Sequence, residues 1–250
     1  MRENQNFFQI YLSEDEAKEL PEPLLSVSRI ARQRFSNFDY ICWTGLMLRD
    51  FISTYYPQDV LNAYDKLRPF AYKADLGRYC LIYKYGGWYA DVTLKIEKNV
   101  LLGNEVDLFF FYDFGEGLPA PGRCSHECQN SFFYAKASHH LLAECIEGVV
   151  KNCRDSFYGG SSTSPTGPEL FGRKLCQHVP NSRSLHGHFM PLTPFHQQRN
   201  LSYVAPSGDI IAQHKSTWHP SKPRGGDLES LGLSGTNNYN DLWRQKAIYL

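Results

Sequence analysis

The stretch that decides the fold is Lys73–Glu97, which reads KADLGRYCLIYKYGGWYADVTLKIE. Its first part has the composition of a helix and places Asp75 and Arg78 three residues apart, as neighbours on one helix surface. Gly77 lies between them and costs about 1 kcal/mol relative to alanine in a helix, which indicates close approach of a ligand or another backbone. The pair Gly86-Gly87 then suits a left-handed helix end.

The residues after Gly-Gly have the alternation of a strand. Apolar residues at 92, 94 and 96 alternate with Asp91, Thr93 and Lys95, which predicts Asp91 and Thr93 on one face. A carboxylate and a hydroxyl two residues apart form an oxygen-rich spot. Such a spot suits Mg²⁺ or Mn²⁺ bridging a diphosphate, because these cations take oxygen ligands and share them with substrate phosphates. The structural alternative is a surface Asp75–Arg78 ion pair, worth about 0.2–0.5 kcal/mol, and a turn capped by Asp91.

The segments before this stretch alternate between strand and helix. Phe7–Leu12 and Phe38–Trp43 are short and aromatic-rich like strands, Leu24–Phe35 suits an amphipathic helix, and Leu46–Leu67 suits two short helices broken at Pro57. This order predicts an α/β fold with a mostly parallel central sheet flanked by helices. Ligands of such sheets bind beyond the carboxyl ends of the strands.

The second half of the chain is less regular. Leu108–Tyr112 predicts a buried central strand and His139–Val150 a helix, while Gly159–Pro168 and Pro206–Gly235 have the composition of loops. No repeat or long linker divides the 250 residues, so we expect a single domain, 1–250.

The charge balance excludes one class of function and points to one segment. The chain has 26 basic and 26 acidic side chains, which argues against a nucleic-acid binder that works by bulk charge. The segment Gln213–Gly226 contains Lys215, Lys222, Arg224 and two histidines but no acid. A cationic loop rich in Gly and Pro can close over a departing diphosphate as a lid.

The cysteines and the apolar runs indicate the compartment. Seven scattered cysteines fit a reduced, cytoplasmic environment, and no run approaches the ~20 apolar residues of a membrane helix or has the core of a signal peptide. The cluster Cys124, His126 and Cys128, with His139 and His140 further on, could supply a zinc site, although free thiols and loop histidines are the simpler interpretation.

The decisive stretch also resembles a known family. Lys73–Leu94 is similar to the sugar-binding region of glycosyltransferase family 32, which is related to the catalytic domains of clostridial glucosylating toxins. That family's pattern is an Asp-x-x-Arg helix, then Tyr-Gly-Gly-x-Tyr and Asp-x-Asp. Thr93 stands at the second aspartate of the last motif. The matching residues are Asp75, Arg78, Tyr85, Gly86, Gly87, Tyr89 and Asp91.

Weaker matches extend the resemblance over nearly the whole chain. Tyr11, on the family's first strand, would lie against the nucleotide base, and Asn130 stands at a substrate-contacting asparagine. Thr166-Gly-Pro168 matches a family turn, and His214–Trp218 matches the C-terminal His and Ser-x-Trp pattern. The structural alternatives are a core aromatic for Tyr11 and a turn-stabilising role for Asn130.

The resemblance implies a GT-A-type nucleotide-sugar-binding fold and transfer of a hexose or N-acetylhexosamine, with retention, from a nucleotide-sugar to a glycan hydroxyl. Residues 1–115 would bind the donor, and 116–250 would supply the acceptor side and the C-terminal lid. Asp91, Asp75 and Arg78 would be catalytic, and Asp91 with Thr93 would hold Mn²⁺ or Mg²⁺. The donor-binding set would be Tyr11, Asp75, Arg78, Asp91, Thr93, Asn130, His214, Lys215, Ser216 and Trp218.

The resemblance also suggests partners and a setting. The Ser-x-Trp pattern favours a UDP-sugar, and the acceptor would be a glycan or lipid-linked saccharide in bacterial surface polysaccharide synthesis, with the enzyme cytoplasmic or peripheral at the inner membrane. The segment Tyr239–Leu250 either touches that membrane or packs on the domain. Two other classes remain open. Thr93 is compatible with a non-catalytic sugar-nucleotide-binding protein, and Asp75 with Asp91 could serve as the two carboxylates of a hydrolase.

Overall fold

A computed structural model describes residues 5–16, 18–113, 127–177, 183–192 and 200–250. The strands are β1 (Asn6–Ile10), β2 (Asp39–Trp43), β3 (Gly87–Ala90), β4 (Lys95–Ile96), β5 (Leu108–Asp113), β6 (Cys128–Ala135), β7 (Ser184–Pro191), β8 (Leu201–Val204) and β9 (Ile210–Gln213). The helices are α1 (Leu24–Arg34), α2 (Gly45–Tyr55), α3 (Gln58–Lys66), α4 (Phe70–Tyr85), α5 (His140–Arg154), α6 (Pro168–Gln177), α7 (Lys215–Trp218), the 3₁₀ helix η1 (Glu229–Leu231) and α8 (Tyr239–Arg244).

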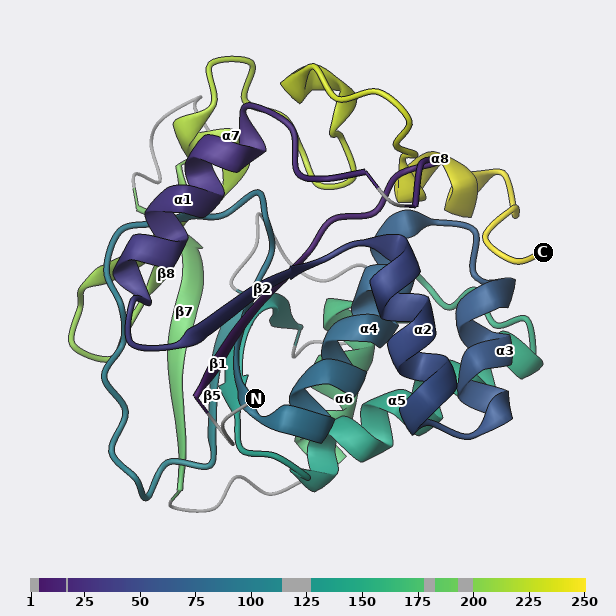
Figure 1. Cartoon of the computed structure of the whole chain (residues 1–250), viewed down its shortest axis with the longest axis horizontal. Helices are drawn as coiled ribbons and strands as arrows, with labels where there is room; N and C mark the ends of the chain where they lie inside the picture. The colour runs from purple at the N-terminus through teal and green to yellow at the C-terminus, as the bar shows by residue number, and fades with distance from the viewer. Residues whose placement is uncertain (1–4, 17, 114–126, 178–182, 193–199) are drawn as a thin grey trace.

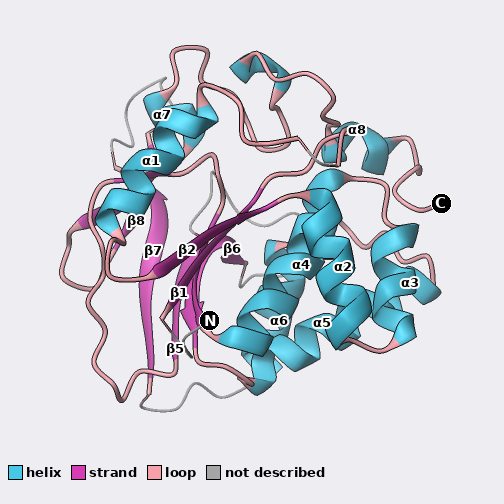
Figure 2. Cartoon of the chain, in the orientation of Figure 1, coloured by secondary structure: helices cyan, strands magenta, loops and turns pink. Residues whose placement is uncertain are grey.

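The strands form one central sheet between two groups of helices. Figures 1 and 2 show α1 on one side of the sheet and α2 to α6 gathered on the other. The alternation along β1 explains the two layers, because Phe7 packs in the cluster that includes Ala31 of α1, whereas Phe8 packs in the cluster under α2 to α6. Each face of the sheet is thereby buried.

The sheet is mixed rather than mostly parallel, so that prediction is wrong. The strand order is β2-β1-β3-β6-β5-β7-β8-β9-β4. The β1–β2, β1–β3 and β5–β7 pairs are parallel, whereas the other five pairs are antiparallel. The predicted strand-helix alternation holds in the first half, where helices return the chain. In the second half, a tight turn at 205–209 joins β8 to β9 directly, which makes neighbouring strands antiparallel.

Most of the predicted elements are confirmed. The helices expected at Leu24–Phe35 and His139–Val150 are α1 and α5, and the break at Pro57 separates α2 from α3. The loop expected at Pro206–Gly235 is only partly a loop, since it contains β9, α7 and η1. Short elements of this kind depend on tertiary contacts more than on local propensity.

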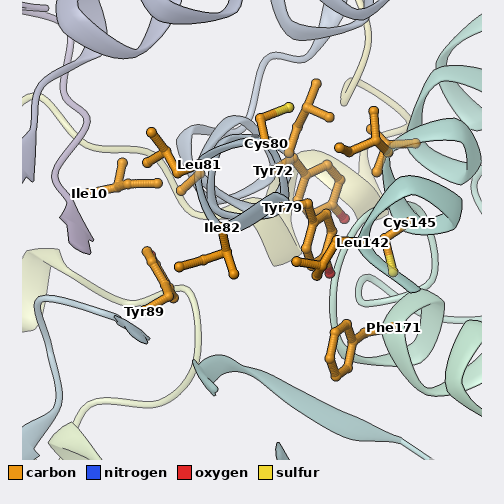
Figure 3. Packing of buried hydrophobic residues seen from close by; sticks show 14 of the residues in the cluster. Ile10, Tyr72, Tyr79, Cys80, Leu81, Ile82, Tyr89, Leu142, Cys145 and Phe171 are labelled. Atoms are coloured by element: carbon orange, nitrogen blue, oxygen red, sulfur yellow. The ribbon is translucent and has the colours of Figure 1, made fainter. Parts of the chain in front are cut away.

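Helix α4 runs through the interior and carries the decisive stretch. Figure 3 shows side chains on opposite sides of it, with Leu81 near Ile10 of β1 and Tyr79 toward Leu142 of α5. Residues 74–82 of α4 are all buried, including Asp75 and Arg78, as in a helix that runs through a core. A Cβ on Gly77 would lie 2.5 Å from Leu48 Cδ2, so the glycine admits α2 and not a ligand or another backbone.

The Gly-Gly turn sets β3 beside β1. Gly86 and Gly87 have φ values of 63° and 111°, which favour glycine as predicted. A Cβ on Gly87 would lie 2.3 Å from the Asn6 carbonyl oxygen. Asn6 Nδ2 also donates to the carbonyl oxygens of Tyr85, at 3.1 Å, and Gly86, at 3.2 Å. The end of α4 is therefore held against the first strand.

We expect Gly87→Ala to destabilise the fold by about 2–5 kcal/mol, since it combines an unfavourable φ with a backbone collision. Gly208 is the matched control, because its φ is 85° but a Cβ there would meet nothing within 4 Å. Gly208→Ala should cost only about 1 kcal/mol. Urea unfolding of the two variants measures the difference, and equal losses would show that the contact with Asn6 carries no weight.

Candidate functional site

Two adjoining cavities open beyond the carboxyl ends of β1 and β3, where the sheet pattern placed the ligand. The larger has a volume of about 280 Å³ and the smaller about 130 Å³. The residues that line both form their common wall, which contains Arg78, Asp91, Thr93 and Lys215 together with Ala71, Gly226 and Tyr239. The sequence-predicted residues therefore meet at one place in the fold.

A buried ion pair on α4 forms the floor of the larger cavity. Arg78 Nη2 lies 3.2 Å from Asp75 Oδ1, and the side chains are 4% and 9% exposed. The predicted i, i+3 pairing is confirmed, but the alternative of a surface pair is wrong, because α4 is buried on every side. Because the pair is shielded from water, its stability depends on good geometry and on further hydrogen bonds to both side chains.

The carboxylate of Asp75 is hydrogen-bonded from two other elements. Asn130 Nδ2 of β6 donates to Oδ1 at 2.8 Å, and the Thr166 hydroxyl donates to Oδ2 at 2.7 Å. Burial raises the pKa of Asp75, and the Arg78 guanidinium opposes that rise. Asn130 therefore contacts the key acid directly and does not merely stabilise a turn.

The guanidinium of Arg78 contacts both acids of the predicted motif, Asp75 and Asp91. Its Nη1 lies 3.2 Å from Asp91 Oδ1 and donates to the Asn130 carbonyl oxygen at 2.9 Å. Its Cζ lies 4.5 Å from the centre of the Tyr89 ring. One cation thus neutralises two carboxylates and positions them relative to each other.

Asp91 lies in a turn, so the predicted strand through Asp91 and Thr93 is wrong. Strand β3 ends at Ala90, and Leu94 N donates to the Asp91 carbonyl oxygen at 3.0 Å. The side chain of Asp91 is 31% exposed, and its Oδ1 accepts from the Tyr89 hydroxyl at 2.8 Å. Thr93 is buried beside it at the common wall of the cavities.

Lys215 is a buried cation without a partner among the described residues. It is 4% exposed, lines both cavities and makes no side-chain hydrogen bond or ion pair there. Burial lowers its pKa to about 8, and the charges of Asp91 and Asp227 oppose that effect. An unpaired buried ammonium is costly, so the arrangement favours an anion in the adjoining space.

The neighbours of Lys215 hold helix α7 in place. His214 Nδ1 accepts from Ser216 N at 3.2 Å and lies 2.7 Å from the Ser216 hydroxyl. The Trp218 indole donates to the Thr93 carbonyl oxygen at 3.0 Å. His214 lines the larger cavity, whereas Ser216 and Trp218 line neither cavity, and donor binding by these two stays a prediction.

Tyr11 lines the smaller cavity at the end of β1. It is buried against Leu24 and Val92, and its hydroxyl has no hydrogen-bond partner among the described residues. Burial raises its pKa. Tyr11 is thus a core aromatic, which was the structural alternative for this residue. It also lines the cavity in which the family resemblance predicts the nucleotide base.

Several site residues were not identified as such from the sequence. Tyr79 follows Asp75 at i+4 and accepts from Asn130 Nδ2 at 2.8 Å, so helical spacing could have revealed it. Thr166 was singled out only as part of a turn. Asp113, Glu127 and Tyr239 line the larger cavity without any sequence signal. Tertiary folding alone brings these last three to the site.

The possible zinc site and the membrane segment received little support. Cys124 and His126 lie outside the described residues, and the described part of the chain holds no group of three His, Cys, Asp or Glu side chains arranged for a metal. Among the described cysteines, Cys42, Cys80, Cys145 and Cys153 are free thiols. At the C-terminus, the Trp243 indole donates to the Tyr158 carbonyl oxygen at 2.8 Å and Ile248 is buried, so the segment packs on the domain.

No helix among the described residues has the length and apolar composition needed to cross a bilayer. Membrane contact by Tyr239–Leu250 stays a prediction, as do the division at residue 115 and the individual catalytic roles.

Comparison with known proteins agrees with the resemblance seen in the sequence. Residues 24–107 match the model of the glycosyltransferase sugar-binding region containing a DXD motif. The chain is 21% identical over 190 residues to an uncharacterized glycosyltransferase of Acanthamoeba polyphaga mimivirus, covering 71% of this chain and 69% of the relative. It is 34% identical over 82 residues to inositol phosphoceramide mannosyltransferase 3 of Schizosaccharomyces pombe, covering 33% of this chain but only 23% of the relative.

The fold also has a counterpart among solved structures. The PaToxG glycosyltransferase superposes with a TM-score of 0.53 at 14% identity, covering 71% of this chain and 70% of that one. The GT-A-type α/β fold is thereby confirmed, apart from the mixed strand directions. The family resemblance and the enzyme class, glycosyltransferase, are confirmed as well.

We expect Arg78→Met to cost about 3–5 kcal/mol of stability, because it leaves Asp75 as a buried, uncompensated charge. Arg49→Met is the matched control. Arg49 contacts Asp65 at 2.8 Å, but both side chains are more than 40% exposed, so its loss should cost at most about 1 kcal/mol. Urea unfolding compares the two, and similar losses would contradict the importance given to the buried pair.

Lys215 should make stability depend on pH. Its pKa is about 8 in the folded protein and would be about 10.4 in an unfolded chain. Between these values the unfolded state binds more protons, so the free energy of unfolding rises with pH, whereas below pH 8 the cost of the buried charge is fully present.

Lys215→Met should therefore be more stable than the wild type at pH 7. Its advantage should shrink by about 1–2 kcal/mol between about pH 7.5 and 9.5. Urea unfolding of both proteins across this range is the measurement, and taking their difference removes the effect of shared tyrosines. A difference that does not change with pH would contradict the burial of a charged lysine.

Proposed function

We propose that this chain, which carries the sugar-binding region of DXD glycosyltransferases, transfers a hexose or N-acetylhexosamine from a UDP-sugar to a hydroxyl of a glycan acceptor, with retention of configuration. The observation that carries the proposal is the pair of adjoining cavities whose common wall contains Arg78, Asp91 and Lys215. A nucleotide-sugar needs this layout, with a base on one side, a sugar on the other and a diphosphate between.

The smaller cavity suits the nucleoside. It is narrow, at about 130 Å³, and lined by Tyr11, Leu12, Val92 and Leu228. An aromatic and aliphatic lining favours a flat base, and the limited volume favours the single ring of uracil over a purine. Tyr11 would offer its ring to the base, because its hydroxyl oxygen is itself buried.

The common wall suits the diphosphate. Lys215 offers a positive charge, and the partly exposed Asp91 carboxylate with the Thr93 hydroxyl offers oxygen ligands. A divalent cation here would be held by Asp91 and Thr93 and would take its remaining ligands from substrate phosphates and water, because one carboxylate and one neutral hydroxyl make a weak ligand set by themselves. When bound, Mn²⁺ or Mg²⁺ would add positive charge beside the leaving group.

The reaction needs no covalent step on the protein. The bond between sugar C1 and the phosphate oxygen breaks, and its electron pair leaves with the nucleoside diphosphate. The acceptor hydroxyl oxygen bonds to C1 from the same face and passes its proton to the departing phosphate. Arg78 holds Asp75 and Asp91 beside the sugar, and Lys215 stabilises the negative charge that develops on the diphosphate.

The larger cavity leaves room for the acceptor. Its lining also includes Asp113, Glu127 and Gln129, which are oxygen-rich side chains suited to hydrogen bonds with sugar hydroxyls. The acceptor is therefore proposed to be a glycan or lipid-linked saccharide. A role in bacterial surface polysaccharide synthesis at the cytoplasmic side of the membrane rests on the family resemblance alone.

Two other functions are alternatives to this proposal. The replacement of the second aspartate by Thr93 favours, as second candidate, a protein that binds a sugar nucleotide without turning it over. A two-carboxylate hydrolase fits less well. Asp75 and Asp91 contact one guanidinium, so they lie on the same side of the cavity, whereas a hydrolase needs its carboxylates to flank the bond.

We expect Asp91→Asn to lower UDP-sugar turnover at least about 100-fold, because it removes the carboxylate charge that Arg78 holds beside the sugar while keeping the side chain's shape. Release of UDP, with Mn²⁺ present, is the measurement, and circular dichroism checks the fold. Asp209→Asn, an exposed carboxylate paired with Lys98, is the control and should leave turnover unchanged. Undiminished turnover in Asp91→Asn would remove Asp91 from the reaction.

A panel of UDP-galactose, UDP-glucose, UDP-N-acetylhexosamine and GDP-mannose identifies the donor in the same assay. GDP-mannose belongs in the panel because one relative is named a mannosyltransferase. Binding of a donor with no release of nucleoside diphosphate from any of them would favour the non-catalytic alternative.

A further inference from the structure

We infer that Lys215 is a built-in cation for the donor diphosphate, and that donor binding and turnover by this chain do not require a divalent metal. The inference rests on the proposed function and concerns the same site. It assigns to one lysine the charge neutralisation that a metal held by two carboxylates would otherwise supply.

The acids of the site, Asp75 and Asp91, already have partners within the protein. Asp75 is fully engaged by Arg78, Asn130 and Thr166. Asp91 Oδ1 already contacts Arg78 and accepts from the Tyr89 hydroxyl, which leaves Oδ2 as its less engaged oxygen. The charges of these acids are thus shared with one guanidinium, so they attract a metal less strongly than free carboxylates would.

Thr93 stands where the family has an acid. Its side chain is a neutral hydroxyl in a residue only 9% exposed, and its carbonyl oxygen accepts from the Trp218 indole. A neutral oxygen is a weaker ligand for a hard cation than a carboxylate. The described part of the chain also brings no third acid, histidine or cysteine into a metal-binding group here.

Lys215 supplies the positive charge that replaces a metal held by this ligand set. Lys215 lines both cavities, as a group that touches the central part of a nucleotide-sugar must. It is 4% exposed and has no ion pair within the described residues. Arg78 is used up by two carboxylates, so Lys215 is the cation at the wall whose charge is left for an incoming anion.

Hydrogen bonds on two sides of helix α7 hold Lys215 in place. His214 N and the Thr217 hydroxyl both donate to the Leu201 carbonyl oxygen, at 3.0 and 2.8 Å, which ties α7 to β8. The Trp218 indole ties the other side of α7 to the 91–94 turn. A positive charge fixed before the reaction stabilises a leaving diphosphate without reorganisation, which is the role a metal ion usually fills.

Calorimetric binding of UDP tests the inference without any turnover. Wild-type protein should bind UDP in EDTA within about tenfold of its affinity in Mn²⁺. Lys215→Met should lose about 10- to 100-fold of its affinity in EDTA, the worth of a hydrogen bond to a charged group. Lys151→Met, which removes a cation that is 68% exposed on α5 and lies outside the proposed site, should bind like the wild type.

Lys215→Arg keeps the charge and should recover much of the metal-free affinity, which separates a missing charge from a disturbed fold. Two results would overturn the inference. One is wild-type binding that falls more than about 100-fold on removal of Mn²⁺, and the other is metal-free binding unaffected in Lys215→Met.

Turnover measurements distinguish this inference from the proposed function. If the proposed function is right, UDP is released from at least one UDP-sugar in the presence of Mn²⁺. If the inference is also right, release continues in EDTA within about tenfold and is lost in EDTA by Lys215→Met. Release that occurs only with Mn²⁺ would sink the inference alone, whereas no release under any condition would sink the proposed function and leave the UDP-binding comparison to judge Lys215.

Discussion

The buried contact of Arg78 with Asp75 and Asp91 is the interaction on which the rest of the site depends. It joins helix α4 to the turn after β3, and Asn130 and Thr166 extend it to β6 and to the loop before α6. Two acids that repel each other would not stay at one buried spot without the guanidinium between them. The Gly-Gly turn and its close fit against Asn6 make this geometry possible, because they end α4 directly beside β1.

The common wall of the two cavities brings charges of both signs together. The acids and Arg78 lie together on α4 and the following turn, while Lys215 reaches the same wall from the C-terminal part of the chain. A chain with zero formal net charge therefore contains a locally polarised cavity. Thr93 is the departure from the family's motif, and the unpaired lysine at the same wall offers a physical compensation, since both affect how much negative charge the wall can accept.

Local pattern was sufficient for the helices and for the first strands, and insufficient where pairing decides the structure. The break at Pro57 and the amphipathic periods of α1 and α5 are properties of the segments themselves. The mostly parallel sheet was wrongly predicted because strand direction depends on which strands become neighbours in the second half. The alternation from Asp91 to Lys95 was misread as a strand because a turn with polar and apolar residues has the same short-range pattern.

The sequence by itself determined the motif, the order of helix, Gly-Gly turn and acid, and the i, i+3 pairing of Asp75 with Arg78, because helical spacing and glycine's backbone freedom are local properties. Only the tertiary structure decided that this pair is buried, that one guanidinium contacts both acids, and that Lys215 faces them unpaired. It also decided that Asp113, Glu127 and Tyr239 line the larger cavity. Contacts between residues far apart in the chain follow from packing and strand pairing, which no short window of sequence contains.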